Sequence, residues 1–196
     1  MPLRASLEKK EEKEKIRVAL LRAALRLAAS HGFSSLGLRE VSREAGIAPT
    51  SFYRHFADME ELGTTLIREL GGSALREIGE RARAASGPAA VAALVDALLA
   101  AVAQDPELMR FVLAERSGAS ASFRASIRSE LAELSRALEA AVGPSQPSPP
   151  RAAEAAVKLL IASVADVFDE PEDARSSLRE ALIVWMTKLV STGGTS

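Results

Sequence analysis

The sequence has no cysteine, only two histidines and few aromatic residues, with one Trp, one Tyr and six Phe in 196 residues. The lack of cysteine excludes disulfides, thiolate metal sites and a cysteine nucleophile. With His31 and His55 as the only histidines, we expect no metal site. The chain also lacks a glycine-rich phosphate loop and the residue set of a serine hydrolase. We therefore expect no catalytic residues, no cofactor and no enzymatic activity.

Long hydrophobic runs are missing as well. The longest one, Ala89–Ala103, is too short to span a bilayer and contains Asp96. Charged residues fill positions 8–15, where a signal peptide would carry apolar ones. Together with the absence of cysteine, these features favour a cytoplasmic protein that does not enter a membrane.

The net charge of −1 conceals an asymmetry between the two parts of the chain. Residues 1–57 contain eleven Lys and Arg against six Asp and Glu, whereas residues 58–196 contain fourteen against twenty. A basic head on an acidic remainder is typical of a protein with a small nucleic-acid-binding part. An ordinary scatter of charges is the alternative, because an excess of five is modest.

Helical periodicity dominates the sequence, and no segment alternates as a strand does. Helices are expected at about residues 12–30, 38–45, 49–57 and 58–83, from Gly87-Pro88 onward, after Asp105, and at about residues 120–142, 151–168 and 174–191. The pattern predicts an all-α protein in two parts. The first three helices form a head (residues 1–57), and about six more form a C-terminal bundle (residues 58–196).

Several residues mark where these helices begin and end. His31-Gly32 ends the first helix, because glycine accepts the left-handed conformation that often follows a helix. Asp58 and Glu61 have the spacing of a capping box at the start of the fourth. Gly71-Gly72 lies inside that helix, where each glycine costs about 1 kcal/mol relative to alanine. Close packing against a neighbouring helix explains this pair better than a hinge between domains.

The most informative segment is LREVSREAGIAPTSFYRHF, at residues 38–56. It predicts two short helices joined by a tight turn at Gly46, which is a helix-turn-helix. The inward positions Leu38, Val41, Ala45, Ile47, Phe52 and Phe56 are apolar and close a small core with the first helix. The outward positions of the second short helix are polar, aromatic and cationic, as contacts with phosphates and base edges require. The candidate DNA-binding residues are Arg39, Ala48, Pro49, Thr50, Ser51, Tyr53, Arg54 and His55.

The segment GIAPTSFYRHF, followed by Asp58, Glu61 and Leu62, resembles the signature of the TetR family of transcriptional regulators. The resemblance covers roughly residues 12–66. It implies an all-helical homodimer, with three helices for DNA and about six for a ligand and for dimerisation. Such a protein binds double-stranded palindromic operator DNA and is more often a repressor than an activator. Met59 departs from the family pattern, since many members have a phosphate-binding lysine there, and Gly37 stands where Ser or Thr commonly caps a helix.

A second resemblance concerns the ligand. Residues 113–124 (LAERSGASASFR) and Glu61-Leu-Gly63 are similar to the branch that represses unsaturated fatty-acid synthesis and responds to long-chain acyl thioesters. It implies acyl-CoA or an acyl-carrier-protein thioester as effector. The alternative is a regulator of an unrelated operon, such as efflux, with another hydrophobic ligand. The candidate ligand-binding residues are Phe111, Arg116, Phe123, Val164, Phe168 and Trp185, although aromatic residues at helical spacing are more often plain core.

The last helix predicts a self-association surface. Trp185 lies on one side of it, whereas Ile183 and Val184 lie on others. A terminal helix that is apolar on more than one side needs a second partner, and another copy of the chain is the economical choice. We therefore expect a homodimer through residues 151–168 and 174–191.

Overall fold

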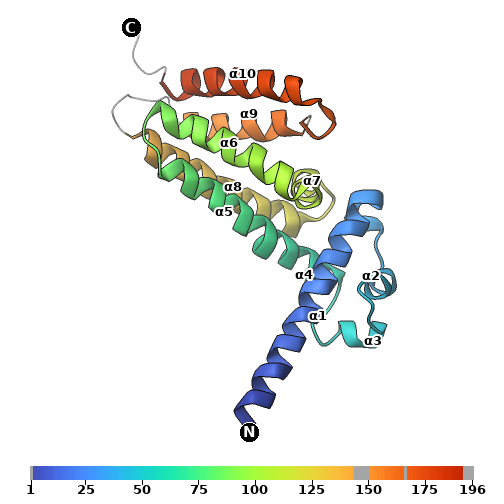
Figure 1. The fold of residues 1–196 in the computed structure, drawn as a ribbon. Helices are drawn as coiled ribbons and strands as arrows, with labels where there is room; N and C mark the ends of the chain where they lie inside the picture. The colour runs from blue at the N-terminus through green and yellow to red at the C-terminus, as the bar shows by residue number, and fades with distance from the viewer. Residues whose placement is uncertain (1, 144–150, 166, 192–196) are drawn as a thin grey trace.

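The computed structural model describes residues 2–143, 151–165 and 167–191, and all of its regular elements are helices (Figure 1). The α-helices are α1 (Pro2–His31), α2 (Leu38–Glu44), α3 (Pro49–Phe52), α4 (Met59–Thr65), α5 (Gly72–Arg83), α6 (Pro88–Gln104), α7 (Pro106–Glu115), α8 (Ala121–Val142), α9 (Ala152–Val164) and α10 (Glu172–Ser191). Short 3-10 turns, η1 (Phe33–Ser35) and η3 (Val167–Asp169), and the π-helical segment η2 (Leu66–Gly71) complete the set. Because α4, η2 and α5 continue one another, these residues form nine helices. The expected all-α fold is confirmed.

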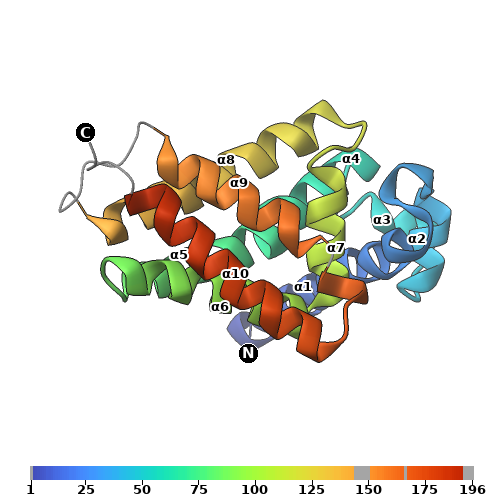
Figure 2. The ribbon, with the colours of Figure 1, turned by 90° about the horizontal axis from the view of Figure 1, so that it is seen from above.

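The helices are arranged as a small head and a larger body (Figure 1). Helices α1, α2 and α3 form the head, and the continuous helix α4–η2–α5 leads from it into the body. In the body, α5 packs against α6 and α8, and α10 packs against α6 and α9. Seen from above, α9 and α10 lie side by side on the outer face of the body (Figure 2). Helix α7 lies where the body meets the head.

The helix ends follow the predicted signals. Helix α1 ends at His31, and Gly32 has a φ of 75°. The Asp58 side chain accepts a hydrogen bond from the Glu61 backbone N–H at 2.8 Å, and the Glu61 carboxylate accepts one from the Ala57 N–H at 2.6 Å. The second bond comes from the residue before the cap, so the two bonds make a shifted form of the expected capping box.

Three predicted boundaries were wrong. Helix α1 begins at Pro2, about ten residues earlier than expected, because the charged run at residues 8–15 interrupts any apolar period in this part of the helix. Helix α3 ends at Phe52, and the backbone continues as turns in which the Arg54 N–H bonds to the Ser51 carbonyl. Helix α9 ends at Val164, so Phe168 lies on η3.

Two clusters of buried apolar side chains hold the molecule together. One fills the body between α5, α6, α8, α9 and α10. The other starts from α1, α2 and α3 and continues past residue 57, through Leu62 and Leu66 to Phe111 on α7 and Phe123 on α8. The head therefore shares its core with the near end of the body. A boundary at residue 57 stays a prediction.

Glycines let the connecting helix pack closely against its neighbours. A Cβ atom added at Gly71 would lie 2.9 Å from a methyl group of Val112, and one at Gly72 would lie 2.8 Å from the Glu130 carboxylate. Both are closer than real Cβ contacts, so an alanine would displace Val112 in the first case and the flexible end of Glu130 in the second. The prediction of close packing at Gly71-Gly72 is confirmed, and η2 places the π-helical turn at the same point.

Within the described residues, no single helix has the length and hydropathy that crossing a membrane requires. Helices α6 and α7 meet that requirement only as a pair, with a bend of 111° between them.

Candidate DNA interface and the junction behind it

The turn between α2 and α3 is fixed by its backbone. Gly46 has a φ of 71°, which favours glycine, and the Ile47 N–H bonds to the Ser42 carbonyl at 2.9 Å. Pro49 occupies the first turn of α3, where a missing N–H costs nothing. Phe52 is fully buried in the head. The sequence thus anchors one side of α3 and leaves the other side to solvent.

The predicted DNA-binding residues lie on this free side. Tyr53 is the most exposed aromatic residue that the structure describes, with 66% of its surface accessible. Arg39, Ala48, Pro49, Thr50 and Arg54 are also exposed, and Ser51 and His55 are half-buried. Because α3 is only four residues long, Tyr53, Arg54 and His55 stand in the turn that follows it. The helix itself presents Pro49, Thr50 and Ser51.

Helix α1 borders this surface with positive charge. The Arg17 guanidinium lies 5.8 Å from the centre of the Phe56 ring and forms ion pairs with Glu69 and, at 3.2 Å, with Glu14. Burial lowers the pKa of His55, and the neighbouring charges of Lys13, Arg17 and Arg54 lower it further. The His55 imidazole is therefore disposed to be neutral at pH 7 in the free protein.

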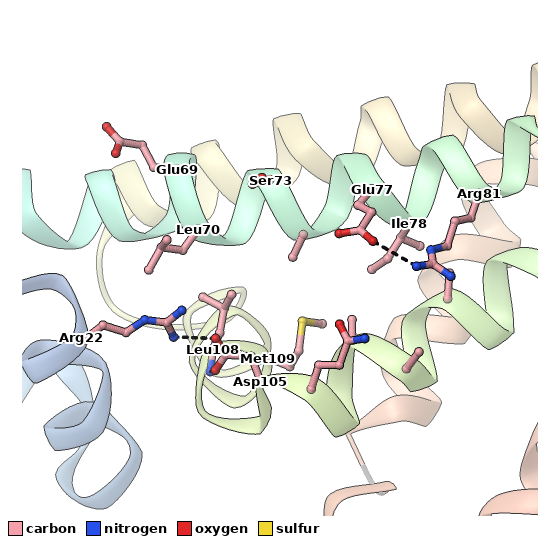
Figure 3. Close-up of a pocket in the computed structure, with 15 residues that line it drawn as sticks. Arg22, Glu69, Leu70, Ser73, Glu77, Ile78, Arg81, Asp105, Leu108 and Met109 are labelled. Atoms are coloured by element: carbon pink, nitrogen blue, oxygen red, sulfur yellow. Dashed lines mark hydrogen bonds and ion pairs between the residues drawn. The ribbon is translucent and has the colours of Figure 1, made fainter. Parts of the chain in front are cut away.

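Behind the interface, an ion pair links head and body. The Arg22 side chain on α1 donates to the Asp105 carboxylate at 2.6 Å, and the same carboxylate caps α7 by accepting from the Leu108 N–H at 3.1 Å (Figure 3). The pair closes one end of a pocket of about 280 Å³ between α5, α6 and α7. Figure 3 shows Leu70, Leu108 and Met109 in this pocket, with Glu77 and Arg81 joined at its far end.

Aromatic packing makes a second link. The Phe33 ring, just after α1, lies 5.6 Å from the Phe111 ring and 5.2 Å from the Phe123 ring, measured between centroids. Gly63 passes so close to Phe33 and Phe123 that a methyl group there would overlap both rings. The end of α1 is thereby packed tightly against α7 and α8.

A second pocket, of about 380 Å³, opens beside this aromatic cluster. Its walls include Phe33, Phe111, Leu113 and Phe168, and the Arg110 guanidinium lies 4.3 Å from the centre of the Phe168 ring. Glu115 also lines the pocket, and burial raises the pKa of its carboxyl group. The pocket is therefore largely apolar, with one poorly solvated carboxylate in its wall.

Comparisons with known proteins match both the head and the whole fold. Residues 20–63 match the family model described as bacterial regulatory proteins, tetR family. The match covers the second part of α1, all of α2 and α3, and the start of α4. The fold agrees with three solved structures. The fatty acid degradation regulator FadR from Bacillus halodurans has a TM-score of 0.72 at 18% identity, covering 88% of this chain and 94% of its own. PfmR, a TetR family regulator from Thermus thermophilus, has a TM-score of 0.67 at 16% identity, covering 90% and 96%. The multidrug binding protein EbrR, complexed with imidazole, has a TM-score of 0.66 at 22% identity, covering 91% and 97%.

Part of the head thus matches the tetR family model, and the whole chain shares its fold with solved structures of such regulators. Its departure at Met59 has a structural counterpart, because this side chain is half-buried and packs against the head core. Gly37 precedes α2 without a side-chain cap. At these two positions the structure thus has packing and an uncapped backbone where the resemblance implies polar contacts.

In the part of the chain that the structure describes, the six predicted ligand-binding residues lie at different places. Phe111 and Phe168 share the 380 Å³ pocket, whereas Phe123 belongs to the aromatic cluster behind it. Val164 is buried in the body core, Arg116 is half-buried at the end of α7, and Trp185 is 52% exposed on α10.

Sequence reasoning missed the residues that join head and body. The Arg22–Asp105 pair spans 83 positions, so no local pattern signals it, and Asp105 was recognised only as a helix cap. Phe33 was not singled out either, although an aromatic residue just after a helix-ending glycine is a usable signal, and Gly63 was named only as part of a resemblance. Lys13 and Arg17 entered only the charge count of residues 1–57, so their position beside His55 was not predicted.

Proposed function

We propose that the regulator binds a palindromic double-stranded operator as a homodimer, in the cytoplasm, and acts as a ligand-responsive repressor. The observation that carries the proposal is the free side of the helix-turn-helix. Thr50, Tyr53 and Arg54 are exposed around a fully buried Phe52, within a region that matches the tetR family model. A short helix anchored by a buried side chain can place its first residues in the major groove, while the N–H groups at its start bind a phosphate.

The DNA-binding part is tested by selecting sequences from a random duplex library on the immobilised protein. A palindromic motif is expected, with half-sites about one DNA turn or slightly more apart, because a two-fold dimer presents two identical heads. Recovery of unselected sequences, with the same affinity for every duplex, would contradict the proposal.

For the effector, we propose a long-chain acyl thioester, either acyl-CoA or acyl-carrier-protein thioester. The pocket of about 380 Å³ supports this proposal, because its walls are largely apolar. Phe111, Leu113 and Phe168 line it next to the end of α1. Each buried methylene contributes roughly 0.8 kcal/mol, so a long chain binds tightly with few polar contacts. A fatty acid degradation regulator among the structural neighbours is in keeping with this ligand.

Glu115 favours an alternative effector, a hydrophobic organic cation. An anionic headgroup would meet Glu115 as well as Arg110 in this pocket, whereas a cation would pair with Glu115 and stack on the phenylalanine rings of the same pocket. The structural neighbour described as a multidrug binding protein is in keeping with a regulator of efflux.

One variant separates the two effectors. Acyl-CoA species of several lengths and tetraphenylphosphonium are titrated into the protein–operator complex, with wild-type protein and with Glu115→Gln. If the acyl proposal holds, acyl-CoA alters operator affinity in both proteins. If the cation is the ligand, tetraphenylphosphonium acts on the wild type and loses its effect in the variant. An effect below twofold for every compound, with no heat of binding, rejects both.

A further inference from the structure

Helix α1 carries an overhang, residues 7–15, that belongs to neither core. It precedes the region that matches the family model, residues 20–63. Every residue of the overhang is exposed, including Leu7. Figure 1 shows α1 continuing beyond α2 and α3, on the side of the molecule that lies away from the body. The overhang thus extends toward the space that DNA occupies when α3 enters a groove.

The charges of the overhang are sorted by face. With 3.6 residues per turn, Lys10 and Lys13 lie above Arg17, whose guanidinium marks the face that looks toward the end of α3. Lys15 and most of the acidic residues, namely Glu8, Glu11 and Glu12, fall on the opposite half. Glu14, at the edge of the basic face, is paired with Arg17 at 3.2 Å.

The basic face reaches the recognition surface. The charge of Lys13 acts on His55 together with those of Arg17 and Arg54, which places Lys13 within electrostatic range of the residues that follow α3. In the described part of the chain, neither Lys10 nor Lys13 takes part in a salt bridge. Arg17 is already held by Glu14 and Glu69, so the two lysines are better placed than Arg17 to meet a new partner.

We propose that the overhang is a second DNA contact, in which Lys10 and Lys13 bind backbone phosphates next to the groove that α3 enters. The proposal rests on the DNA-binding function above. At a rise of 1.5 Å per residue, Lys10 stands roughly 10 Å beyond Arg17 along α1, a distance that reaches phosphates outside the half-site. The resemblance implies a phosphate-binding lysine at position 59, where this chain has Met59. Lys10 and Lys13 supply positive charge in its place. Because phosphates carry no sequence information, the overhang adds affinity without changing the preferred sequence.

The experiment measures operator affinity against salt concentration for the full-length protein. The double variant Lys10→Gln/Lys13→Gln is compared with Lys15→Gln, which removes the same kind of charge from the opposite face, and with Lys10→Arg/Lys13→Arg, which keeps the charge. Removing one lysine–phosphate interaction should lower the slope of log K against log salt by about 1 and weaken binding roughly fivefold at 0.15 M salt. The loss of affinity should be the same for the operator and for unrelated DNA.

We expect Lys15→Gln and the arginine variant to bind like wild type. Circular dichroism checks that α1 stays helical, which it should because glutamine is nearly as good a helix former as lysine. The overhang proposal is overturned if the double glutamine variant keeps the wild-type slope of log K against log salt. It is also overturned if Lys15→Gln loses as much operator affinity for its one charge as the double variant loses for each of its two. If wild-type protein itself fails to bind DNA, the proposed function fails instead, so the two failures are distinguishable.

Discussion

At the scale of single residues, the most informative environment is that of His55. Its side chain is half-buried, and its Nδ1 atom has no hydrogen-bond partner among the described residues. Burial is the largest cause of its lowered pKa, followed by the charges of Lys13, Arg17 and Arg54. These cations lie beside the surface that we propose for DNA binding. An arrangement that would favour a phosphate there also disfavours the imidazolium.

This gives a prediction of pH dependence. A histidine whose folded pKa lies below the unfolded value of about 6.5 binds protons more readily when unfolded. Its contribution to stability is complete above pH 6.5 and is lost as the pH falls toward the folded pKa. We expect the melting temperature of wild-type protein to fall over this range more than that of His55→Gln. Operator DNA, whose phosphates raise the pKa, should reduce the difference. Identical melting curves for the two proteins from pH 7.5 to 5 would contradict this account.

At the scale of helices, Gly63 shows how tightly head and body are joined. A methyl group there would come within 2.7 Å of the Phe33 ring and overlap the Phe123 ring. Overpacking of this kind costs about 1–3 kcal/mol, which outweighs the better helix propensity of alanine. We expect Gly63→Ala to lower the free energy of unfolding by that amount in denaturant titrations.

Gly37 provides the matched control. No atom lies within 4 Å of a Cβ built at this position, and its backbone has the extended conformation of a helix cap. Gly37→Ser should therefore leave stability unchanged or raise it by a few tenths of a kcal/mol. Equal effects of the two substitutions would show that Gly63 is not a point of close contact.

The Arg22–Asp105 pair is the second connection at this scale. Both side chains are partly exposed, so we expect a coupling energy of roughly 0.2–1 kcal/mol from a double-mutant cycle with Arg22→Gln and Asp105→Asn. Asparagine keeps the cap of α7, whereas Asp105→Ala also loses it and should cost about 1 kcal/mol more. A zero coupling energy, measured by urea unfolding, would show that the pair does not join head and body.

The sequence predicts helices well where an apolar period meets a cap. Asp58, Asp105 and Pro49 mark helix starts correctly, and Gly32 marks an end. Prediction from the sequence fails where a helix has no apolar period, or where the period continues past the end of the helix. The overhang of α1 is helical without an apolar stripe, and Phe168 keeps the spacing of α9 after that helix has stopped.

At the scale of the whole molecule, the outer face of α10 predicts a dimer. Leu182, Met186 and Val190 are buried in the body, whereas Val184, Trp185 and Leu189 are exposed. The stripe that faces the body thus runs through Leu182, Met186 and Val190, and Trp185 and Leu189 lie outside it. Buried and exposed apolar residues on one helix are explained most simply by a second copy packing on α9 and α10.

Sedimentation at micromolar concentration should therefore give twice 20.7 kDa. Trp185→Glu should shift the protein to monomer and weaken operator binding, because two linked heads bind a palindrome better than one. Val18→Glu, at an exposed apolar position on α1, should leave the dimer intact. A monomeric wild type with full operator affinity would exclude this interface.

At this scale the sequence indicates which segment forms the recognition surface and which segments form the body. It does not show which distant residues meet in the interior. The recognition surface is encoded in a contiguous segment, residues 38–56, so Tyr53 and Arg54 could be found by reading outward positions. The junction is encoded by residues far apart in the chain, such as Phe33 and Phe123. Candidate pocket residues were therefore chosen by type, and only Phe111 and Phe168 proved to share a pocket.

The most direct test compares the dissociation constants for a selected operator and for a scrambled duplex at one salt concentration. For wild-type protein we expect the operator to bind on the order of a thousandfold or more tightly than the scrambled duplex. Arg54→Ala and Tyr53→Phe should each cost about 1–3 kcal/mol on the operator and less on scrambled DNA, while Arg128→Ala, on the far α8, changes neither. Equal affinity of wild-type protein for both duplexes, or variants that keep wild-type affinity and salt slope, would contradict a regulator that reads DNA through its exposed helix-turn-helix surface.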